Sequence, residues 1–381
     1  MADSDKEHHV NEAEEESLSN SSDDQQKAEM LMNTKKGDMG GSHMMDEDNE
    51  EDDDKEDMEN DREPTPTGGK ADKTKNKIQD ADRQRLKVEE YSKKIREIHK
   101  HWIETEKPWE DPDFPPFNAS IFKDQAKLQE MVKEFKNWKW QRPHEINKDA
   151  KFTLGNKGDC DMKVGHSSDG LFIGALSMVS THPVVDNLFI DVDNMEKGYV
   201  SFQFHKNGEW RYIIVDTLLP YYPETKTLLF SHCYEQNEFW VSLVEKAYAK
   251  LNGCYEYIQG ISICETLVDL TGGVADKINL ETPESKNNLE SGAIFNNMSS
   301  YLNQNFILGS VKRVYGKTIR NAEAGEHGIL ENYYHGIMET AEFPKDDFRL
   351  VKIRNFWGPD SNWNGQFSNN ADEWDKYKHI T

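Results

Sequence analysis

Residues 151–181 have the sequence KFTLGNKGDCDMKVGHSSDGLFIGALSMVST, in which a polar, glycine-rich loop leads into an apolar run. The run predicts a buried helix from Leu171 to Val179. Backbone N–H groups and the macrodipole at a helix N-terminus stabilise a thiolate, so this junction would suit a nucleophilic cysteine. It holds Gly170 instead, and the nearest thiol, Cys160, lies ten residues upstream.

The negative charge of the chain is concentrated at its N-terminus. The 381 residues include 71 acids and 46 bases, a net charge of −25; residues 1–70 hold 24 acids and 7 bases, a net of −17, which leaves −8 for the remainder. Nucleic-acid binding needs clustered Lys and Arg, so we expect no nucleic-acid partner. No apolar run reaches the roughly 18 residues of a membrane span, and no signal peptide is visible. The four cysteines lack metal-like spacing, which favours a reduced, cytoplasmic location.

Residues 1–80 are predicted to be a disordered acidic tail. They contain few aromatic or β-branched residues and cannot bury enough apolar surface to offset the entropy of ordering. The acidic run at residues 46–57 could bind Ca²⁺ loosely or a basic partner, but blocks of like charge are usually solvated tails.

Residues 81–107 are predicted to form an amphipathic helix. The apolar residues recur at spacings of three and four, as on one stripe of a helix: Val88, Tyr91, Ile95, Ile98 and Trp102. The stripe either packs on the following domain or forms a short coiled coil or partner-binding helix.

The remaining residues are predicted to have an α+β fold with a helical first half, 108–273, and an antiparallel β-rich second half, 274–381. Alternating apolar residues flank the Asn207-Gly208 pair, which is a hairpin signal. A long helix follows at residues 237–258, and the Gly272-Gly273 pair marks the division between the halves.

Several motifs resemble the protease core of calpains, the cytosolic Ca²⁺-dependent cysteine peptidases. They are EDPDFPP (110–116), RPHEI (142–146), GEWRYIIVDTLLP (208–220), NEFWVSLVEKAYAKLNG (237–253), DLTGGV (269–274) and RNFWG (354–358). The resemblance extends from Trp109 to Trp374. It implies a papain-like fold of two subdomains, with the second truncated at its C-terminus.

The same resemblance implies that the nucleophile position is empty. Calpains carry the nucleophile in QGxLGDCWxLAA, and the segment that aligns here without a gap is VGHSSDGLFIGA (164–175). Val164 then replaces the glutamine that donates to the oxyanion, and Gly170 replaces the cysteine. Cys160 lies in a Gly-Asp-Cys triplet that imitates the signature, but using it would insert ten residues before the helix, so we interpret it as a loop cysteine.

The other members of the family's catalytic set have matching positions in the second half. His335 matches the catalytic base, with His327 as a weaker alternative. Asn355 matches the asparagine that orients the imidazole, and Trp357 the indole that shields their hydrogen bond. Without a thiolate, we expect His335 and Asn355 to form a hydrogen-bonded core pair.

Two glycines that let a calpain substrate lie against the cleft floor are also replaced. Only glycine permits such close backbone approach, and the matching residues are Ile261 and Tyr334. Loss of a nucleophile alone costs several orders of magnitude in rate. With the groove obstructed as well, we expect no peptidase activity.

Calcium binding is implied at one core site and lost at the other. The first site matches the backbone oxygens of Leu154 and Asn156 and the carboxylates of Asp161 and Glu245, a set suited to a hard cation. Alternatively, Glu245 forms an ion pair, for example with Lys163. The acids of the second site match Asn362 and Asn369, which are neutral.

Three functional hypotheses follow. The first is a catalytically inactive calpain-like protein, a scaffold or regulatory module that binds unidentified protein partners. The second is an active Ca²⁺-dependent cysteine endopeptidase that uses Cys160 or another thiol. The third is a structural subunit of a cytoskeletal or ciliary assembly.

Overall fold

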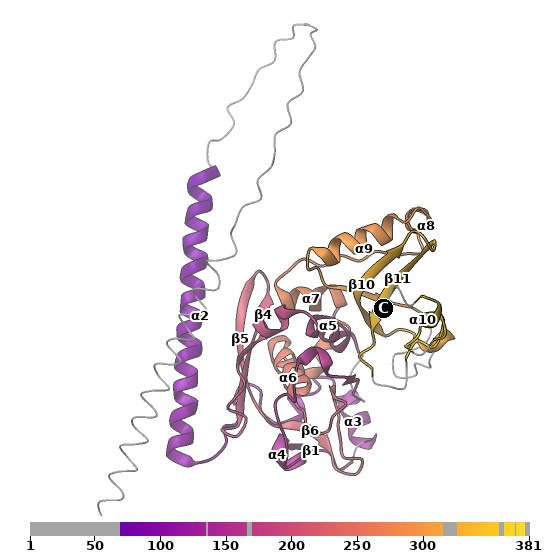
Figure 1. Ribbon diagram of the computed structural model, residues 1–381. Coiled ribbons are helices and arrows are strands. Elements are labelled where there is room, and N and C mark those ends of the chain that lie inside the picture. Colours follow the sequence, from indigo (N-terminus) through magenta and orange to yellow (C-terminus); the bar gives the residue numbers. More distant parts are fainter. Residues whose placement is uncertain are drawn as a thin grey trace, which may run out of the picture. The chain divides into compact units, whose positions relative to one another are not determined.

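The computed structural model (Figure 1) describes residues 69–381 apart from residue 135 and the segments 166–169, 315–325, 358–361, 370 and 378–381. The acidic run at residues 46–57 and most of the predicted tail therefore lie outside the described residues. The chain divides into two compact units, residues 1–97 and 98–381.

The first described element is a long helix, α2, which spans Gly69–Thr105. The predicted end of the tail at residue 80 stays a prediction, and the helix of the structure begins earlier, at Gly69. Once a helix is established, each further residue adds one backbone hydrogen bond, so a polar segment can extend it without a core of its own. The expected stripe is present, since Val88, Ile95 and Ile98 are buried.

The described part of the first half contains five α-helices, and the first ten residues of one of them, α6, are buried. Their bounds are α3 (Gln125–Glu134), α4 (Pro143–Ile146), α5 (Leu171–Ser180), α6 (Trp240–Asn252) and α7 (Ile263–Thr271). All ten residues from Trp240 to Ala249 are buried, including the charged Glu245 and Lys246. The Phe172 ring of α5 stacks on Tyr248 of α6 at a centroid distance of 4.8 Å.

Three small antiparallel sheets accompany these helices, in the strand orders β1-β6-β7, β2-β8 and β3-β4-β5. Their bounds are β1 (Lys139–Gln141), β2 (Met162–Lys163), β3 (Phe189–Asp191), β4 (Tyr199–Lys206), β5 (Glu209–Asp216), β6 (Leu219–Tyr222), β7 (Thr227–Leu228) and β8 (His232–Cys233). The predicted hairpin at Asn207-Gly208 is confirmed. It joins β4 to β5, and both turn residues have positive φ, 55° and 80°, as a two-residue hairpin turn requires.

A buried charge network fixes α6 against the N-terminal part of the core. Lys246 Nζ lies 2.5 Å from Asp216 Oδ1, and neither side chain is exposed. Lys250 Nζ lies 2.6 Å from Asp111 Oδ2, and the Asp111 N–H donates to Asp216 Oδ2 at 2.8 Å. The buried Arg142 guanidinium is also attracted to Asp216. The sequence motifs at residues 110–116, 142–146, 208–220 and 237–253 therefore meet in one structural network.

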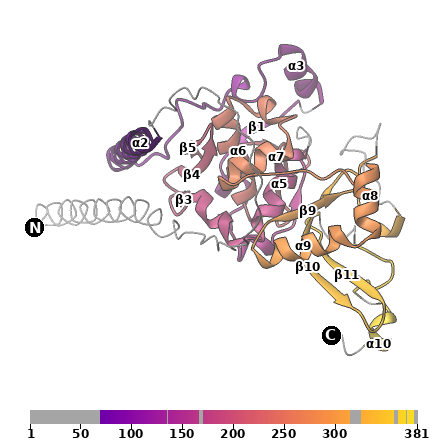
Figure 2. The same ribbon diagram turned by 90° about the horizontal axis from the view of Figure 1, so that it is seen from above.

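The second half consists of one three-stranded antiparallel sheet and short helices. The bounds are α8 (Pro283–Glu290), α9 (Ala293–Asn303), β9 (Leu308–Val311), β10 (Tyr334–Phe343), β11 (Phe348–Arg354) and α10 (Glu373–Lys376). The strand order is β11-β10-β9, and α9 lies along β9 and β10 (Figure 2).

The predicted α+β class is confirmed, because the unit contains both helices and antiparallel sheets. Among the described strands, every ladder joins strands of the same half. The division at residue 273 into two subdomains stays a prediction. None of the described helices is both long enough and apolar enough to span a membrane.

Candidate functional site

Helix α5 begins where the sequence predicted, and its first turn carries no nucleophile. Gly170 is the N-cap residue, with φ of 78°, and its carbonyl accepts from the Gly174 N–H at 2.9 Å. A left-handed residue at this point favours glycine over any residue with a side chain. The nine residues from Phe172 to Ser180 are buried, so the helix itself is firmly held in the core.

The side chain of Tyr334 lies over this first turn. A Cβ atom placed on Gly174 would be only 3.0 Å from Tyr334 Cδ2 and 3.4 Å from its Cβ. The tyrosine is 6% exposed, and its hydroxyl accepts from Arg313 Nη2 at 2.8 Å. The residue predicted to obstruct the groove is therefore packed against the helix that would carry the nucleophile.

His335, the predicted base, is buried at the start of β10 and is 4% exposed. Its Nδ1 lies 3.1 Å from the carbonyl oxygen of Tyr333; a carbonyl only accepts, so Nδ1 carries the proton. Nε2 has no hydrogen-bond partner among the described residues. Burial lowers the pKa of His335, against a smaller raising effect of the Tyr333 carbonyl. The imidazole is thus neutral at pH 7 and is held by its own strand.

The expected hydrogen bond between His335 and Asn355 is not formed. Asn355 Oδ1 instead accepts from the backbone N–H of Trp357 at 3.0 Å, and its Nδ2 donates to Asn362 Oδ1 at 3.4 Å. The short asparagine side chain closes a turn in its own loop, a local bond with which a distant imidazole must compete. The prediction of a bonded core His–Asn pair was therefore wrong for this arrangement.

Trp357 contacts the two residues that precede His335 in the chain. Its Nε1 donates to the carbonyl of Tyr334 at 2.8 Å, and its ring meets that of Tyr333 edge-on, with centroids 4.6 Å apart. Phe356 is fully buried and packs on Gly336, where a Cβ would lie 3.1 Å from Phe356 Cε2. Trp357 thus covers the start of β10, but there is no His335–Asn355 hydrogen bond for it to shield.

The remaining predicted groove residues are apolar and partly buried. Val164 and Ile261 both pack against the hydrophobic core, and neither side chain can donate a hydrogen bond. The chain is tightly confined after Val164, because a Cβ on Gly165 would lie 2.2 Å from the Phe230 backbone. His327, the alternative base, is exposed, and its ring centroid lies 5.0 Å from that of Trp363.

The residues expected to bind calcium do not form an open cation site. Both oxygens of the buried Glu245 carboxylate accept from Ser231, at 2.7 Å from its N–H and 3.0 Å from its hydroxyl. Asp161 is paired with Arg354 at 3.1 Å. These carboxylates are therefore already occupied by protein donors.

The predicted backbone ligands differ in their exposure and hydrogen bonding. Leu154 is 47% exposed, and the Asn156 carbonyl accepts from the Asp159 N–H at 3.0 Å. The suggested alternative, a Glu245–Lys163 ion pair, is not formed: the Lys163 ammonium lies over the Tyr234 ring at 4.2 Å. As arranged, this donor set does not fit a calcium ion, which takes six to eight oxygen ligands.

Arg354 and Arg313 are the site residues that the sequence analysis missed. Arg354 joins the end of β11 to Asp161, and the adjacent Phe356 carbonyl accepts from the Met162 N–H at 2.7 Å. Arg313 holds the Tyr334 hydroxyl. Arg354 directly precedes the recognised Asn355, so its position could have been noticed, but no pattern in the sequence indicated its partner.

Comparisons with known proteins agree with the motifs. Residues 109–380 match the calpain family cysteine protease domain. Calpain-type cysteine protease ADL1 of Oryza sativa subsp. japonica is 31% identical over 290 residues, which are 72% of this chain and 13% of that protein. Calpain of Schistosoma mansoni is 30% identical over 278 residues (70% and 34%), and human Calpain-9 is 31% identical over 273 residues (70% and 37%). The chain thus spans well under two thirds of the length of these relatives.

Proposed function

This chain belongs to the calpain family of cysteine proteases, and we propose that it is a member without peptidase activity, which acts as a scaffold or regulatory module for protein partners. The observation that carries the proposal is the Tyr334 ring packed on the first turn of α5, beside Gly170. A peptide bond and its attacking sulfur would both have to lie there.

This chain lacks the groups that thiol proteolysis requires. The reaction needs a thiolate, an imidazole that is held by a third group, and a donor to the oxyanion. Gly170 supplies no sulfur, Val164 no donor, and Nε2 of His335 has no partner among the described residues. Loss of the nucleophile by itself costs roughly 10⁶-fold in rate.

The residues of the core are retained although the catalytic nucleophile and the oxyanion donor are replaced, and this difference supports a binding role. The buried network around Lys246 and Asp216 is intact, so the fold is held by groups that catalysis does not use. The acidic N-terminal segment, which carries a net charge of −17 over residues 1–70, is the part of the chain that would bind protein partners. The third hypothesis, a subunit of a cytoskeletal or ciliary assembly, has no specific support among the contacts.

The competing hypothesis, an active peptidase that uses Cys160, is disfavoured by the surroundings of that thiol. Cys160 is 7% exposed, and its S–H donates to the Asp161 carbonyl at 3.3 Å. It follows a short 3₁₀ turn, η2 (Lys157–Asp159), instead of preceding a long helix. A cytoplasmic location remains part of the proposal, in keeping with four free thiols.

An epoxide-type cysteine-protease inhibitor, added with Ca²⁺, is expected to leave Cys160 unlabelled in the full chain. The measurement is the intact mass, followed by peptide mapping of the alkylated residue. Cys264 is the least buried of the four thiols, so slow, non-specific alkylation is expected there. The Cys264→Ala variant should remove that background.

Stoichiometric labelling that Cys160→Ala abolishes would overturn the proposed inactivity. Labelling that persists in Cys160→Ala and disappears in Cys264→Ala would be simple thiol reactivity and would support it. Casein cleavage measured on the same samples separates alkylation from turnover, since only an oriented catalytic set supports the latter.

Calcium binding through Asp161 is expected to be undetectable, although the calpain family is generally regulated by calcium. Arg354 and Ser231 hold the two carboxylates that an ion would need. Calorimetric titration of the full chain with Ca²⁺ should give the same isotherm for wild type and Asp161→Asn, because any weak binding to the acidic N-terminal segment is common to both. Saturable binding that only Asp161→Asn removes would establish a retained site.

A further inference from the structure

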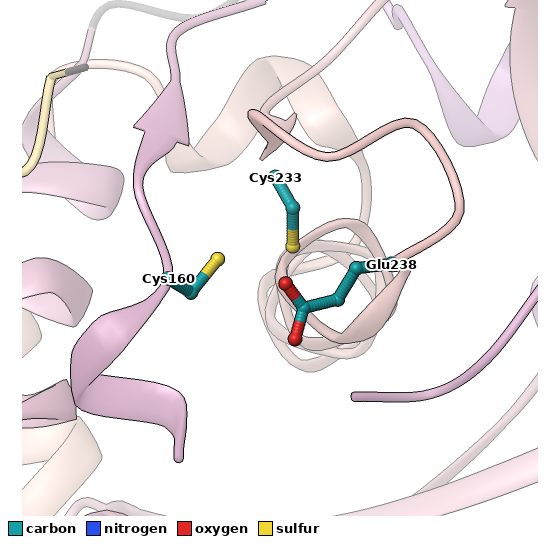
Figure 3. A group of neighbouring side chains, drawn as sticks. All are labelled: Cys160, Cys233 and Glu238. Atoms are coloured by element: carbon teal, nitrogen blue, oxygen red, sulfur yellow. The ribbon is translucent and has the colours of Figure 1, made fainter. Parts of the chain in front are cut away.

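Two buried cysteines and a buried glutamate converge on one point beside β8. Cys160 comes from the loop after η2, Cys233 from β8, and Glu238 from the segment before α6; their sulfur and carboxylate atoms all lie within 4.8 Å of one another. The exposed fractions are 7%, 2% and 5%. Figure 3 shows the two sulfurs and the carboxylate directed into a shared space. Among the described residues, no other group of three or more potential ligands is so close.

The backbone fixes these groups in place. Met162 pairs with Cys233 across β2 and β8, and the Tyr234 N–H donates to the Asp161 carbonyl at 2.8 Å. The segments that carry the two sulfurs are therefore joined by strand hydrogen bonds. Such support from the scaffold reduces the ordering cost of ligand binding.

The glutamate is oriented by one of its oxygens. Oε1 of Glu238 accepts from the Leu154 N–H and from the Thr153 hydroxyl, each at 2.9 Å. Oε2 makes no hydrogen bond to a described residue. Carboxylates that ligate metal ions are held in the same way: a neighbouring group forms hydrogen bonds to the carboxylate, and one oxygen stays available for the metal.

We propose that Cys160, Cys233 and Glu238 form a binding site for a thiophilic divalent metal ion of the zinc class. Two sulfurs at the usual zinc–sulfur distance of about 2.3 Å stand roughly 3.8 Å apart on a tetrahedral ion, within the span found here. Two thiolates and one carboxylate suit zinc and exclude calcium, which prefers oxygen ligands alone. Three protein ligands leave a fourth position for water.

The two cysteines are free thiols in the structure. Cys160 lies in the loop before β2, whereas Cys233 lies on β8. In the metal-free state, burial raises the pKa of the Cys233 thiol, with a further raising effect of the adjacent Cys160, so metal binding must release thiol protons.

Cd²⁺ is the probe for the test, because cadmium thiolates absorb in the ultraviolet. Titration of the reduced, full-length chain should give a charge-transfer band that saturates at one ion per chain, and Zn²⁺ should displace the cadmium. In Cys160→Ser and Cys233→Ser the affinity should fall by more than the roughly 10- to 100-fold that the loss of a supporting residue costs. Glu238→Gln should keep the band and weaken binding.

Cys254→Ser is the matched control, because Cys254 is also buried and free but lies outside the group; it should leave the band and the affinity unchanged. Circular dichroism checks that each variant is folded. If Cys233→Ser does not fold, Cys160→Ser still provides the test, because Cys160 is the most exposed of the three residues.

Any of three results would overturn the site: no band in the wild type, a band that both serine variants of the group retain, or a band lost in Cys254→Ser. A Cys160–Cys233 disulfide in the untreated chain, found as a mass lower by two hydrogens, together with no cadmium binding after reduction, would also reject it.

Discussion

Replacing Lys246 with methionine is expected to lower the free energy of unfolding by about 3–5 kcal/mol, the usual cost of breaking a buried ion pair from one side. Neither Lys246 nor its partner Asp216 is exposed. The Asp216 carboxylate would remain buried and would keep the N–H donors of Asp111 and Leu218, at 2.8 and 2.9 Å. The attraction of the Arg142 guanidinium would then be its remaining charge compensation. Burial already lowers the pKa of Lys246 despite this partner, which shows how strongly the site disfavours an uncompensated charge.

Urea unfolding of the full chain measures the effect, as a lower midpoint at an unchanged m-value. Lys352→Met is the matched control. Lys352 lies 2.6 Å from Glu339, but the two side chains are 65% and 68% exposed, and an exposed pair contributes about 0–1 kcal/mol. Similar losses in the two variants would contradict the structural role assigned to the Lys246 network.

Restoring the missing groups together is expected to produce an active thiol. The variant carries Gly170→Cys, Val164→Gln, Ile261→Gly and Tyr334→Gly, and it should become labelled by an epoxide inhibitor at residue 170. Removal of the Tyr334 ring uncovers the first turn of α5, and the backbone carbonyl at this position can still accept from Trp357 Nε1. A helix N-terminus then lowers the pKa of the new thiol.

Gly170→Cys alone should not be labelled at an enhanced rate, because the ring still covers the turn and no oxyanion donor is present. The triple variant without Gly170→Cys controls for reactions of the four native thiols. Adding Asn355→Ala to the quadruple variant should reduce casein cleavage, since the asparagine must then orient His335. A folded quadruple variant that is neither labelled nor active would show that further groups are missing.

Two elements were predicted from local sequence alone, namely the Asn207-Gly208 turn and the start of α5 at Leu171. Both depend on residues close together in the chain. The helix predicted at residues 237–258 is shorter in the structure, where α6 spans Trp240–Asn252. The start of α2 at Gly69 is not visible in the local sequence. Helix extension into residues 69–80 depends on the helix already formed after them, and composition alone does not reveal that.

The sequence did not predict the hydrogen bonds of the candidate site residues. The expected His335–Asn355 bond was wrong, because Asn355 bonds within its own loop. The expected partner of Glu245 was Lys163, and the structure supplies Ser231 instead. Side-chain hydrogen bonds are short and directional, so a small difference in how two segments pack changes the partner.

By itself, the sequence determined the family, the class of fold and the absence of a thiol at residue 170, because motifs and residue identities are properties of the chain. Only the tertiary structure decided that Tyr334 covers the first turn of α5, that Arg354 holds Asp161, and that Cys160 meets Cys233 and Glu238. These contacts join residues more than 70 positions apart, and they depend on how the elements pack around one core, which no local pattern encodes.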